Sequence, residues 1–155
     1  SDDVVFIQAD AVKYTSDWRY DAIISFETIE HVPDSLAVLK NFSTLLKRGG
    51  LLIISSPNKP VTSPNSNKSG NPFHFKEFTI AELTAELIKC GFQLPDDYLF
   101  GQRLRRYFKN RYLRRIHKMI FRPDLKNSAE VSRVKIGSSK FPRYFVIKAI
   151  MQRVS

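Results

Sequence analysis

The sequence predicts an α/β fold organised around a largely parallel sheet. Two apolar runs, residues 21–26 and 51–54, have the continuous hydrophobicity of strands that are buried on both faces. Between them, residues 35–47 carry apolar side chains at helical spacing, which predicts an amphipathic helix packed on the sheet. A second helix is predicted after Thr79, because Thr79 and Glu82 have the spacing of a capping box.

The composition is that of one soluble domain. At 155 residues with 43% hydrophobic content, the chain is long enough for one core and too short for two ordinary domains. No apolar run approaches the ~20 residues that cross a bilayer, and no signal peptide is evident, so we expect a cytoplasmic protein. The single cysteine, Cys90, sits at an apolar helical position beside Gly91, which favours a buried structural thiol.

The run at residues 21–26 ends abruptly in polar residues. Ligands of open α/β sheets bind just beyond the carboxyl ends of the strands, so Ser25, Phe26 and Glu27 fall where a cofactor would be met. His31 follows closely and is the best candidate general base, because an imidazole titrates near ~6.5. The alternative is that Glu30 and His31 only begin the next helix and orient the loop.

Two segments carry a family resemblance: DAIISFETIEHVPD at 21–34 and LLKRGGLLIISSPN at 45–58. Together they resemble the middle of a class I S-adenosylmethionine-dependent methyltransferase, within the group that includes ubiquinone-biosynthesis O-methyltransferases and bacterial methyltransferases of cell-surface glycan clusters. The resemblance covers roughly residues 4–100. It implies a Rossmann-like sheet with helices on both faces, S-adenosylmethionine as cofactor, and O- or N-methylation of a small-molecule or glycan-like acceptor.

The resemblance also assigns roles to single residues. A strand predicted at Val4–Ile7 is followed by Asp10 and Ala11, which match the pair that contacts adenine in the family. From the residues alone, Asp10 serves equally well as a cap for the following turn. Substrate contacts are expected from Asn58, which lies in a predicted loop at 55–70, and from His74, although a histidine between two phenylalanines is as often a packed structural group.

The turn after the run at residues 21–26 also carries three potential metal ligands. Some ubiquinone-type relatives are thought to hold a divalent ion, and Glu27, Glu30 and His31 match that idea. Three ligands on one turn are weak evidence, so the sequence predicts no metal.

The C-terminal third is predicted to complete the sheet. A weaker strand at 92–102 and a clear strand at 141–150 are expected to pair antiparallel, as in the resembled fold. Between them lies a basic segment, Arg103–Arg122, which predicts a helical insertion over about 102–122. It serves either as an anionic-surface site or as a solvated helix whose arginine stems cover apolar surface. The first option gives an alternative function, a non-catalytic module for an anionic partner; nucleic acid is disfavoured because no nucleic-acid motif is present.

Two family features are missing from the sequence. None of its six glycines forms a G-x-G turn after a strand, and no acidic end of a second strand is present to hold the ribose. The resemblance therefore begins at the third strand of the usual order 3-2-1-4-5-7-6, which leaves residues 4–7 without their normal neighbour. We expect upstream residues in the natural protein, and we expect the 155 residues alone to bind S-adenosylmethionine weakly, because the glycine turn is what approaches the cofactor's methionine end.

Overall fold

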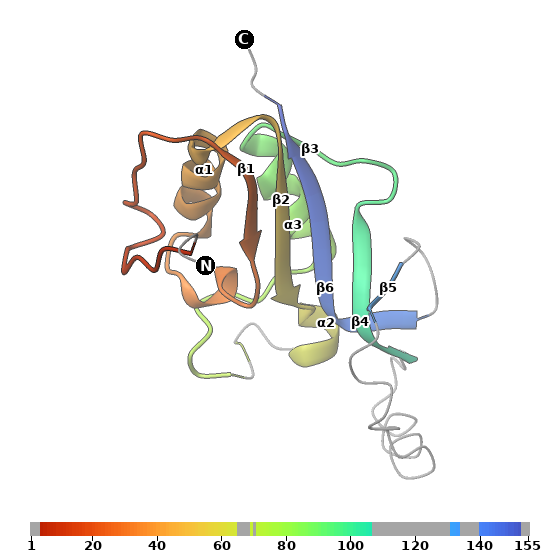
Figure 1. The fold of residues 1–155 in the computed structure, drawn as a ribbon. Coiled ribbons are helices and arrows are strands. Elements are labelled where there is room, and N and C mark those ends of the chain that lie inside the picture. The colour runs from red at the N-terminus through yellow and green to blue at the C-terminus, as the bar shows by residue number, and fades with distance from the viewer. Residues whose placement is uncertain (1–3, 65–68, 70, 107–130, 134–139, 153–155) are drawn as a thin grey trace.

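The protein is built on one mixed sheet, seen in a computed structural model that describes residues 4–64, 69, 71–106, 131–133 and 140–152. The strands lie in the order β1-β2-β6-β4-β5, and the short β3 pairs with β6 beyond the end of β4 (Figure 1). Their bounds are β1 Tyr20–Ser25, β2 Leu46–Pro57, β3 Phe92–Gln93, β4 Leu99–Arg106, β5 Val131–Arg133 and β6 Lys140–Met151. The first four positions of this order match the 4-5-7-6 half of the expected sheet.

Strands β1 and β2 form the predicted parallel pair. Their register runs from Ala22 opposite Leu51 to Ser25 opposite Ile54. The crossover between them is α1 (Ser35–Leu45), whose N-cap residue Asp34 accepts a hydrogen bond from the Ala37 amide. The helix ends two residues earlier than predicted, and Gly49, with a φ of +78°, lies in the irregular start of β2 instead of at the helix end.

The C-terminal strands confirm the predicted antiparallel pairing. Strand β6 lies between β2 and β4 and pairs antiparallel with both, from Leu51 opposite Ile150 to Pro57 opposite Tyr144 on the β2 side. The predicted helical insertion is wrong at its start, because residues 103–106 belong to β4 and pair with β6. The rest of the basic segment, residues 107–122, lies outside the described residues.

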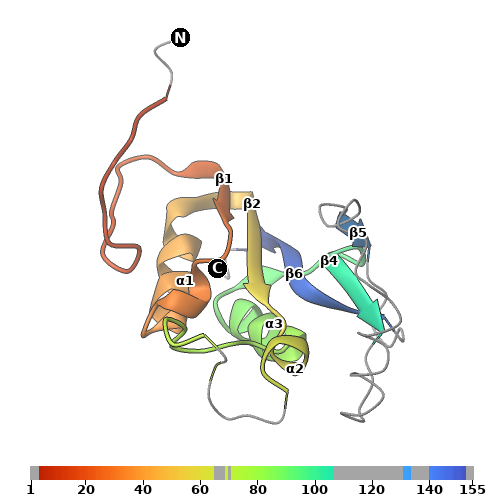
Figure 2. The ribbon, with the colours of Figure 1, turned by 90° about the horizontal axis from the view of Figure 1, so that it is seen from below.

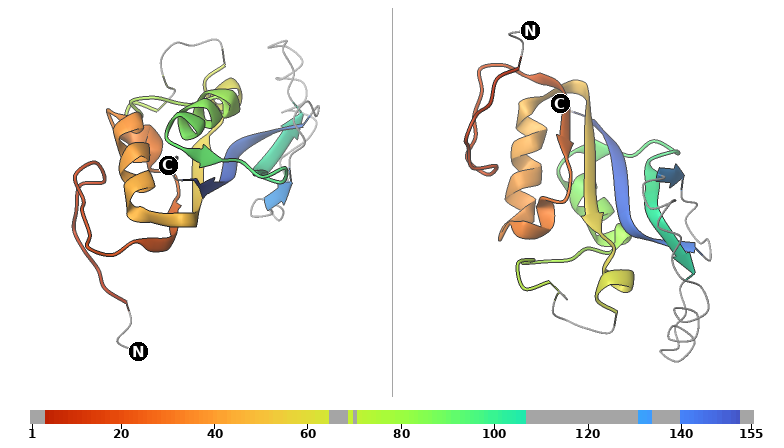
Figure 3. Two further views of the ribbon diagram at one scale, coloured as in Figure 1. Left: turned by 90° about the horizontal axis from the view of Figure 1, so that it is seen from above. Right: turned by 60° about the horizontal axis from the view of Figure 1, so that its bottom comes forward.

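The core lies between the sheet and two helices on one of its faces. Helices α1 and α3 (Ile80–Lys89) lie side by side on that face, as the views along the sheet show (Figures 2 and 3). Strand β6 alternates accordingly, with Phe145, Ile147 and Ala149 buried and the residues between them half-buried. Within the described residues, the expectation of helices on both faces is therefore met on one face only.

The predicted strand at Val4–Ile7 is wrong. These residues form no strand, and their side chains are exposed, with Phe6 94% accessible. The apolar pattern is that of a buried strand, but a strand also needs a neighbour for its backbone groups. Among the described strands, β1 pairs with β2 only, so the segment runs as an extended coil past its open edge (Figure 1).

Two smaller predictions concern single features. Cys90 is buried and free, and burial raises the pKa of its thiol, which fits a structural role. Within the described ranges, no helix combines the length and the apolar character that crossing a bilayer requires.

The first testable prediction concerns the cap of α3. The Thr79 hydroxyl accepts from the Glu82 amide and the Glu82 carboxylate accepts from the Thr79 amide, which confirms the capping box. Thr79→Ala removes one half of it and should lower the free energy of unfolding by ~1 kcal/mol. Thermal unfolding measures the loss, and Thr79→Ser, which keeps the hydroxyl, is the matched control. Equal transitions in all three proteins would show that the box adds nothing.

Candidate functional site

A cavity of about 390 Å³ lies beyond the carboxyl ends of the parallel strands β1 and β2. This is the edge at which open α/β sheets bind ligands, and the volume lies within the range of small-molecule pockets. Its walls come from the exit of β1, the end of β2, the segment 71–77 and the start of β6. They carry Glu27, Glu30, His31, Pro57, Thr62, Asn71, His74, Glu77, Arg143 and Tyr144.

The exit of β1 is held in an unusual backbone conformation. Glu27 has a φ of +49°, in the left-handed region of backbone conformation that residues other than glycine rarely adopt. The Ser55 hydroxyl at the end of β2 stabilises it, because this oxygen accepts from the Glu27 amide at 2.9 Å and donates to the Glu27 carboxylate at 2.7 Å. Strain of this kind concentrates at functional sites and is retained only where the surroundings enforce it.

The segment 71–78 is tied to the sheet edge at two points. The carbonyl of Glu30, in the 3-10 helix η1 (Ile29–His31), accepts from the Phe75 amide at 2.8 Å. At the other end, the carbonyl of Phe78 accepts from the amide of Lys59, the first residue of the short helix α2 (Lys59–Thr62). The predicted loop at 55–70 is thus strand β2 up to Pro57 and then helix α2, with residues 65–68 and 70 outside the description.

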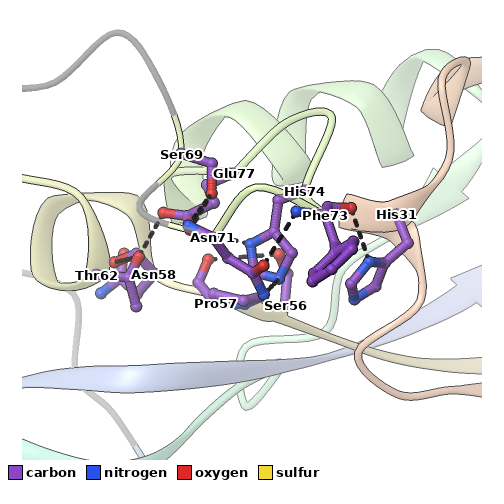
Figure 4. A network of polar contacts seen from close by, with 10 residues as sticks. All are labelled: His31, Ser56, Pro57, Asn58, Thr62, Ser69, Asn71, Phe73, His74 and Glu77. Atoms are coloured by element: carbon purple, nitrogen blue, oxygen red, sulfur yellow. Dashed lines mark hydrogen bonds and ion pairs between the residues drawn. The ribbon is translucent and has the colours of Figure 1, made fainter.

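Glu77 is the centre of a polar network at the back of the cavity (Figure 4). Its carboxylate accepts from Thr62 at 2.6 Å, from Ser69 at 2.7 Å and from the His74 Nδ1 at 3.0 Å. Burial alone would raise the pKa of Glu77, but these hydrogen bonds outweigh it, so the pKa of the carboxyl lies below its ordinary value. Glu77 is therefore a satisfied buried anion.

The two histidines meet edge to face, with ring centroids 4.7 Å apart. The Nδ1 of His31 lies 3.0 Å from the Phe73 carbonyl, and the Nδ1 of His74 faces Glu77 (Figure 4). A carbonyl or carboxylate partner at Nδ1 requires the proton there, which leaves the Nε2 of each ring as the basic nitrogen. On His74 this nitrogen lies 2.9 Å from the Asn71 Nδ2.

Glu30 is the unusual group of the site. It is 1% exposed, lines the cavity, and has no hydrogen-bond partner on either carboxylate oxygen. Burial raises the pKa of Glu30, and the charge of nearby Glu27 raises it further. Desolvation likewise raises the pKa of Glu27.

The other predicted cofactor residues, Asp10, Ala11, Ser25 and Phe26, do not line the cavity. Asp10 is exposed, and its Oδ1 accepts from the Val12 amide at 2.8 Å, so it does cap the following turn. The carbonyl of Ala11 accepts from Asn41 on α1. Ser25 is buried at the end of β1, whereas Phe26 is 56% exposed.

Of the two predicted substrate residues, the structure places only one in the cavity wall. His74 lines the cavity, but Asn58 does not. Asn58 is 2% exposed, and its side-chain amide donates to the Pro142 carbonyl at 2.9 Å. Its bonds therefore hold β6 against the end of β2.

Several cavity residues were missed by the sequence analysis. Arg143 and Tyr144 reach the site through the antiparallel register of β6, which no local pattern reveals. Glu77 could have been found from the sequence, because it lies three residues after His74. At this spacing a turn can bring two side chains together. A potential metal-binding group also differs from the one considered, because it joins Glu30 and His31 with His74 in place of Glu27.

The second prediction tests the burial of Glu30. A carboxyl whose pKa is raised by folding stabilises the fold only below its ordinary pKa and costs stability above the raised one. In chelator-treated protein, Glu30→Gln should thus increase the free energy of unfolding at pH 7 by on the order of 1 kcal/mol, since a buried charge costs more than a neutral group.

Denaturant unfolding at several pH values measures this effect, and the gain should shrink toward pH 4. Glu77→Gln is the matched control, because Glu77 is a satisfied anion and its replacement should destabilise the protein. A destabilised Glu30→Gln at pH 7 would contradict the prediction.

Comparisons with known proteins agree that the chain is similar to methyltransferases. A family model described as a methyltransferase domain matches residues 2–120. A probable S-adenosylmethionine-dependent methyltransferase of Mycolicibacterium smegmatis is 35% identical over 80 residues, which are 52% of this chain and 31% of that protein. A ubiquinone biosynthesis O-methyltransferase of Xanthomonas axonopodis is 34% identical over 88 residues, covering 50% of this chain and 37% of that protein. The chain thus spans about a third of the length of these relatives.

A solved structure shows the same fold at low identity. An S-adenosylmethionine-dependent methyltransferase of Thermotoga maritima superposes with a TM-score of 0.66 and 18% identity, covering 96% of this chain and 65% of that one.

Proposed function

We propose that the protein transfers a methyl group from S-adenosylmethionine to an oxygen or nitrogen of a small-molecule or glycan-like acceptor. The chain belongs to the methyltransferase domain family, and this membership is the basis of the proposal. The observation that carries the proposal is the position of the cavity beyond the carboxyl ends of β1 and β2, with two histidines in its wall.

The cofactor is assigned to the turn at Asp10 and to the exit of β1. Asp10 and Ala11 would contact adenine, and Ser25, Phe26 and Glu27 would line the path of the cofactor toward the cavity. The strained backbone of Glu27 and its double hydrogen bond to Ser55 support this assignment, since they fix one conformation at the point where β1 meets the cavity.

The chemistry requires positioning and one proton transfer. The sulfonium already makes the methyl group electrophilic, so the acceptor must be held in line with the carbon–sulfur bond that breaks. For a hydroxyl acceptor, the carbon–oxygen bond forms as its proton moves to a base. His31 is assigned this role, because its Nδ1 is anchored at the Phe73 carbonyl and its Nε2 is the basic nitrogen.

The remaining substrate assignments follow the geometry of the wall. His74 would contact the acceptor directly, because it lines the cavity and Glu77 fixes its ring. Asn58 would act as a positioning residue through β6, whose residues Arg143 and Tyr144 form the opposite wall. Among the described lining residues, the carboxyl groups of Glu27, Glu30 and Glu77 are accompanied by one guanidinium, that of Arg143, so this part of the wall favours a neutral or cationic acceptor over an anionic one.

The third prediction tests the cofactor site in the full-length protein. Asp10→Ala should weaken S-adenosylmethionine binding by ~1–3 kcal/mol, the cost of an unpaired hydrogen-bonding group. Isothermal titration calorimetry measures the affinity. Asp17→Ala, which removes an exposed carboxylate from the same segment, is the matched control and should bind as the wild type does. An unchanged affinity in Asp10→Ala would remove Asp10 from the site.

The fourth prediction tests the base. His31→Asn should lower kcat by ~10²–10⁴-fold for a hydroxyl acceptor, with cofactor affinity retained, because a positioned base contributes about that much. His74→Asn is the comparison variant and should mainly raise KM. The reverse pattern, with kcat lost in His74→Asn and kept in His31→Asn, would move the base to His74.

A further inference from the structure

The carboxylate of Glu30 lacks the partners that buried anions need. The side chain is 1% exposed and lines the cavity, yet neither oxygen accepts a hydrogen bond within the described part of the chain. Buried carboxylates are otherwise hydrogen-bonded or paired with a positive charge, because an uncompensated anion is costly. Glu77, on the same cavity wall, shows the ordinary solution, with hydrogen bonds on both oxygens. Glu30 therefore lacks a partner that a ligand could supply.

The charges around the cavity favour a cationic partner for Glu30. Among the described lining residues, three carboxyl groups are accompanied by one guanidinium, that of Arg143. The side-chain hydrogen bonds that the structure shows for Glu27 and Glu77 come from hydroxyls and from His74, and not from a lysine or arginine. Their negative charge therefore stays in the cavity, and the electrostatically complementary group of a ligand is positive.

Two imidazoles lie next to the Glu30 carboxylate. One of its oxygens and one ring nitrogen each of His31 and His74 lie within 4.8 Å of one another. In each ring Nδ1 faces an oxygen acceptor, so Nε2 carries the free lone pair (Figure 4). A primary ammonium group has three N–H donors and no acceptor. It can therefore donate to the carboxylate and to one Nε2 at the same time, while the other Nε2 remains available for proton transfer.

We propose that the acceptor is a vicinal amino alcohol, such as an amino sugar, whose ammonium group is held by Glu30 and His74 beside the hydroxyl that is methylated. This inference rests on the proposed methyl transfer and names the acceptor of that reaction. His31 keeps its role, because its Nε2 takes the hydroxyl proton as the methyl carbon passes from sulfur to oxygen. The ammonium group keeps its three protons. The short span of the three side-chain atoms fits an amino group and a hydroxyl on neighbouring carbons.

Binding of the ammonium group requires a local movement at the cavity wall. Both carboxylate oxygens of Glu30 are buried, and the Nδ2 of Asn71 lies 2.9 Å from the His74 Nε2. Because Nε2 is the acceptor of that bond, the Asn71 amide occupies the place of one ammonium N–H. Rotation of the Asn71 side chain frees the nitrogen for the ligand, and charge-assisted hydrogen bonds to Glu30 offset the bond that is lost.

The test is the binding of small probes by the full-length protein at pH 7 without cofactor. Two matched pairs serve as probes: ethanolamine with ethylene glycol, and D-glucosamine with D-glucose. Titration calorimetry at constant ionic strength should show saturable binding of the amines at one site. The neutral partners should bind at least about tenfold more weakly, because hydrogen bonds between charged groups are the stronger ones.

Variants of Glu30 separate recognition from folding. Glu30→Gln should lower the affinity for the amines by at least about tenfold and leave the affinity for the neutral partners unchanged. The same variant is expected to raise the free energy of unfolding, whereas loss of a purely structural carboxylate would lower it. Glu30→Asp keeps the charge and should retain part of the preference for amines. Asp17→Asn, which removes an exposed carboxylate outside the cavity wall, is the matched control for net charge and should bind the amines as the wild type does.

A second titration identifies which molecule the ammonium site serves. S-adenosylmethionine also carries an ammonium group at its methionine end, so the amine titration is repeated with saturating S-adenosylhomocysteine. Unchanged amine affinity supports an acceptor site. Competition between the two ligands would assign Glu30 to the cofactor and overturn the proposal.

Other results of the first titration also overturn the proposal. These are equal binding of amines and neutral partners, no saturable amine binding in natively folded wild type, and amine binding that survives Glu30→Gln. Because the first titration contains no cofactor, such a failure leaves the proposed methyl transfer intact. Failure of the full-length protein to bind S-adenosylhomocysteine would instead contradict the proposed function and leave the amine result standing.

Discussion

The pairing of β2 with two different neighbours is the constraint on which the site depends. Its parallel register with β1 places both carboxyl ends at one edge of the sheet, so Glu27 and Ser55 meet there. Its antiparallel register with β6 brings Tyr144 opposite Pro57 at the same edge. One strand therefore joins the exit of β1 to a wall that comes from the end of the chain. A shift of either register by one residue would reverse which side chains face the cavity.

Unequal hydrogen bonding divides the acidic groups of the cavity into two kinds. Glu77 is surrounded by hydroxyls and an imidazole, which lower its pKa despite burial, so it remains a fixed negative charge that orients His74. Glu30 is also buried and receives no such side-chain bonds, so desolvation raises its pKa. The pKa values of the two carboxyl groups thus shift in opposite directions, because hydrogen bonds outweigh desolvation at Glu77 and do not at Glu30. The first serves structure, and the second is available to a ligand.

The sequence predicts what consecutive residues specify and misses what distant pairing specifies. The β1, α1 and β2 unit, the capping box of α3 and the C-terminal strand pair all follow from local patterns. Arg143 and Tyr144 could not be placed, because their position depends on the register of β6. The prediction of a strand at residues 4–7 was wrong for the converse reason. Their pattern is that of a buried strand, but a strand also needs a neighbouring strand to pair with. His74 was recognised as a candidate, although its contact with His31 and Glu30 was not.

The turn that follows Asp10 is held by a helix and not by the sheet. Because residues 4–7 form no strand, backbone pairing does not position the turn that follows them. The Asn41 side chain of α1 does so instead, since its amide donates to the carbonyls of both Ala11 and Tyr14 at 2.9 Å. Helix α1 is in turn fixed by the core that it shares with β2. The segment of the proposed adenine contact is thus held by α1, while η1, directly before α1, contributes Glu30 and His31 to the cavity.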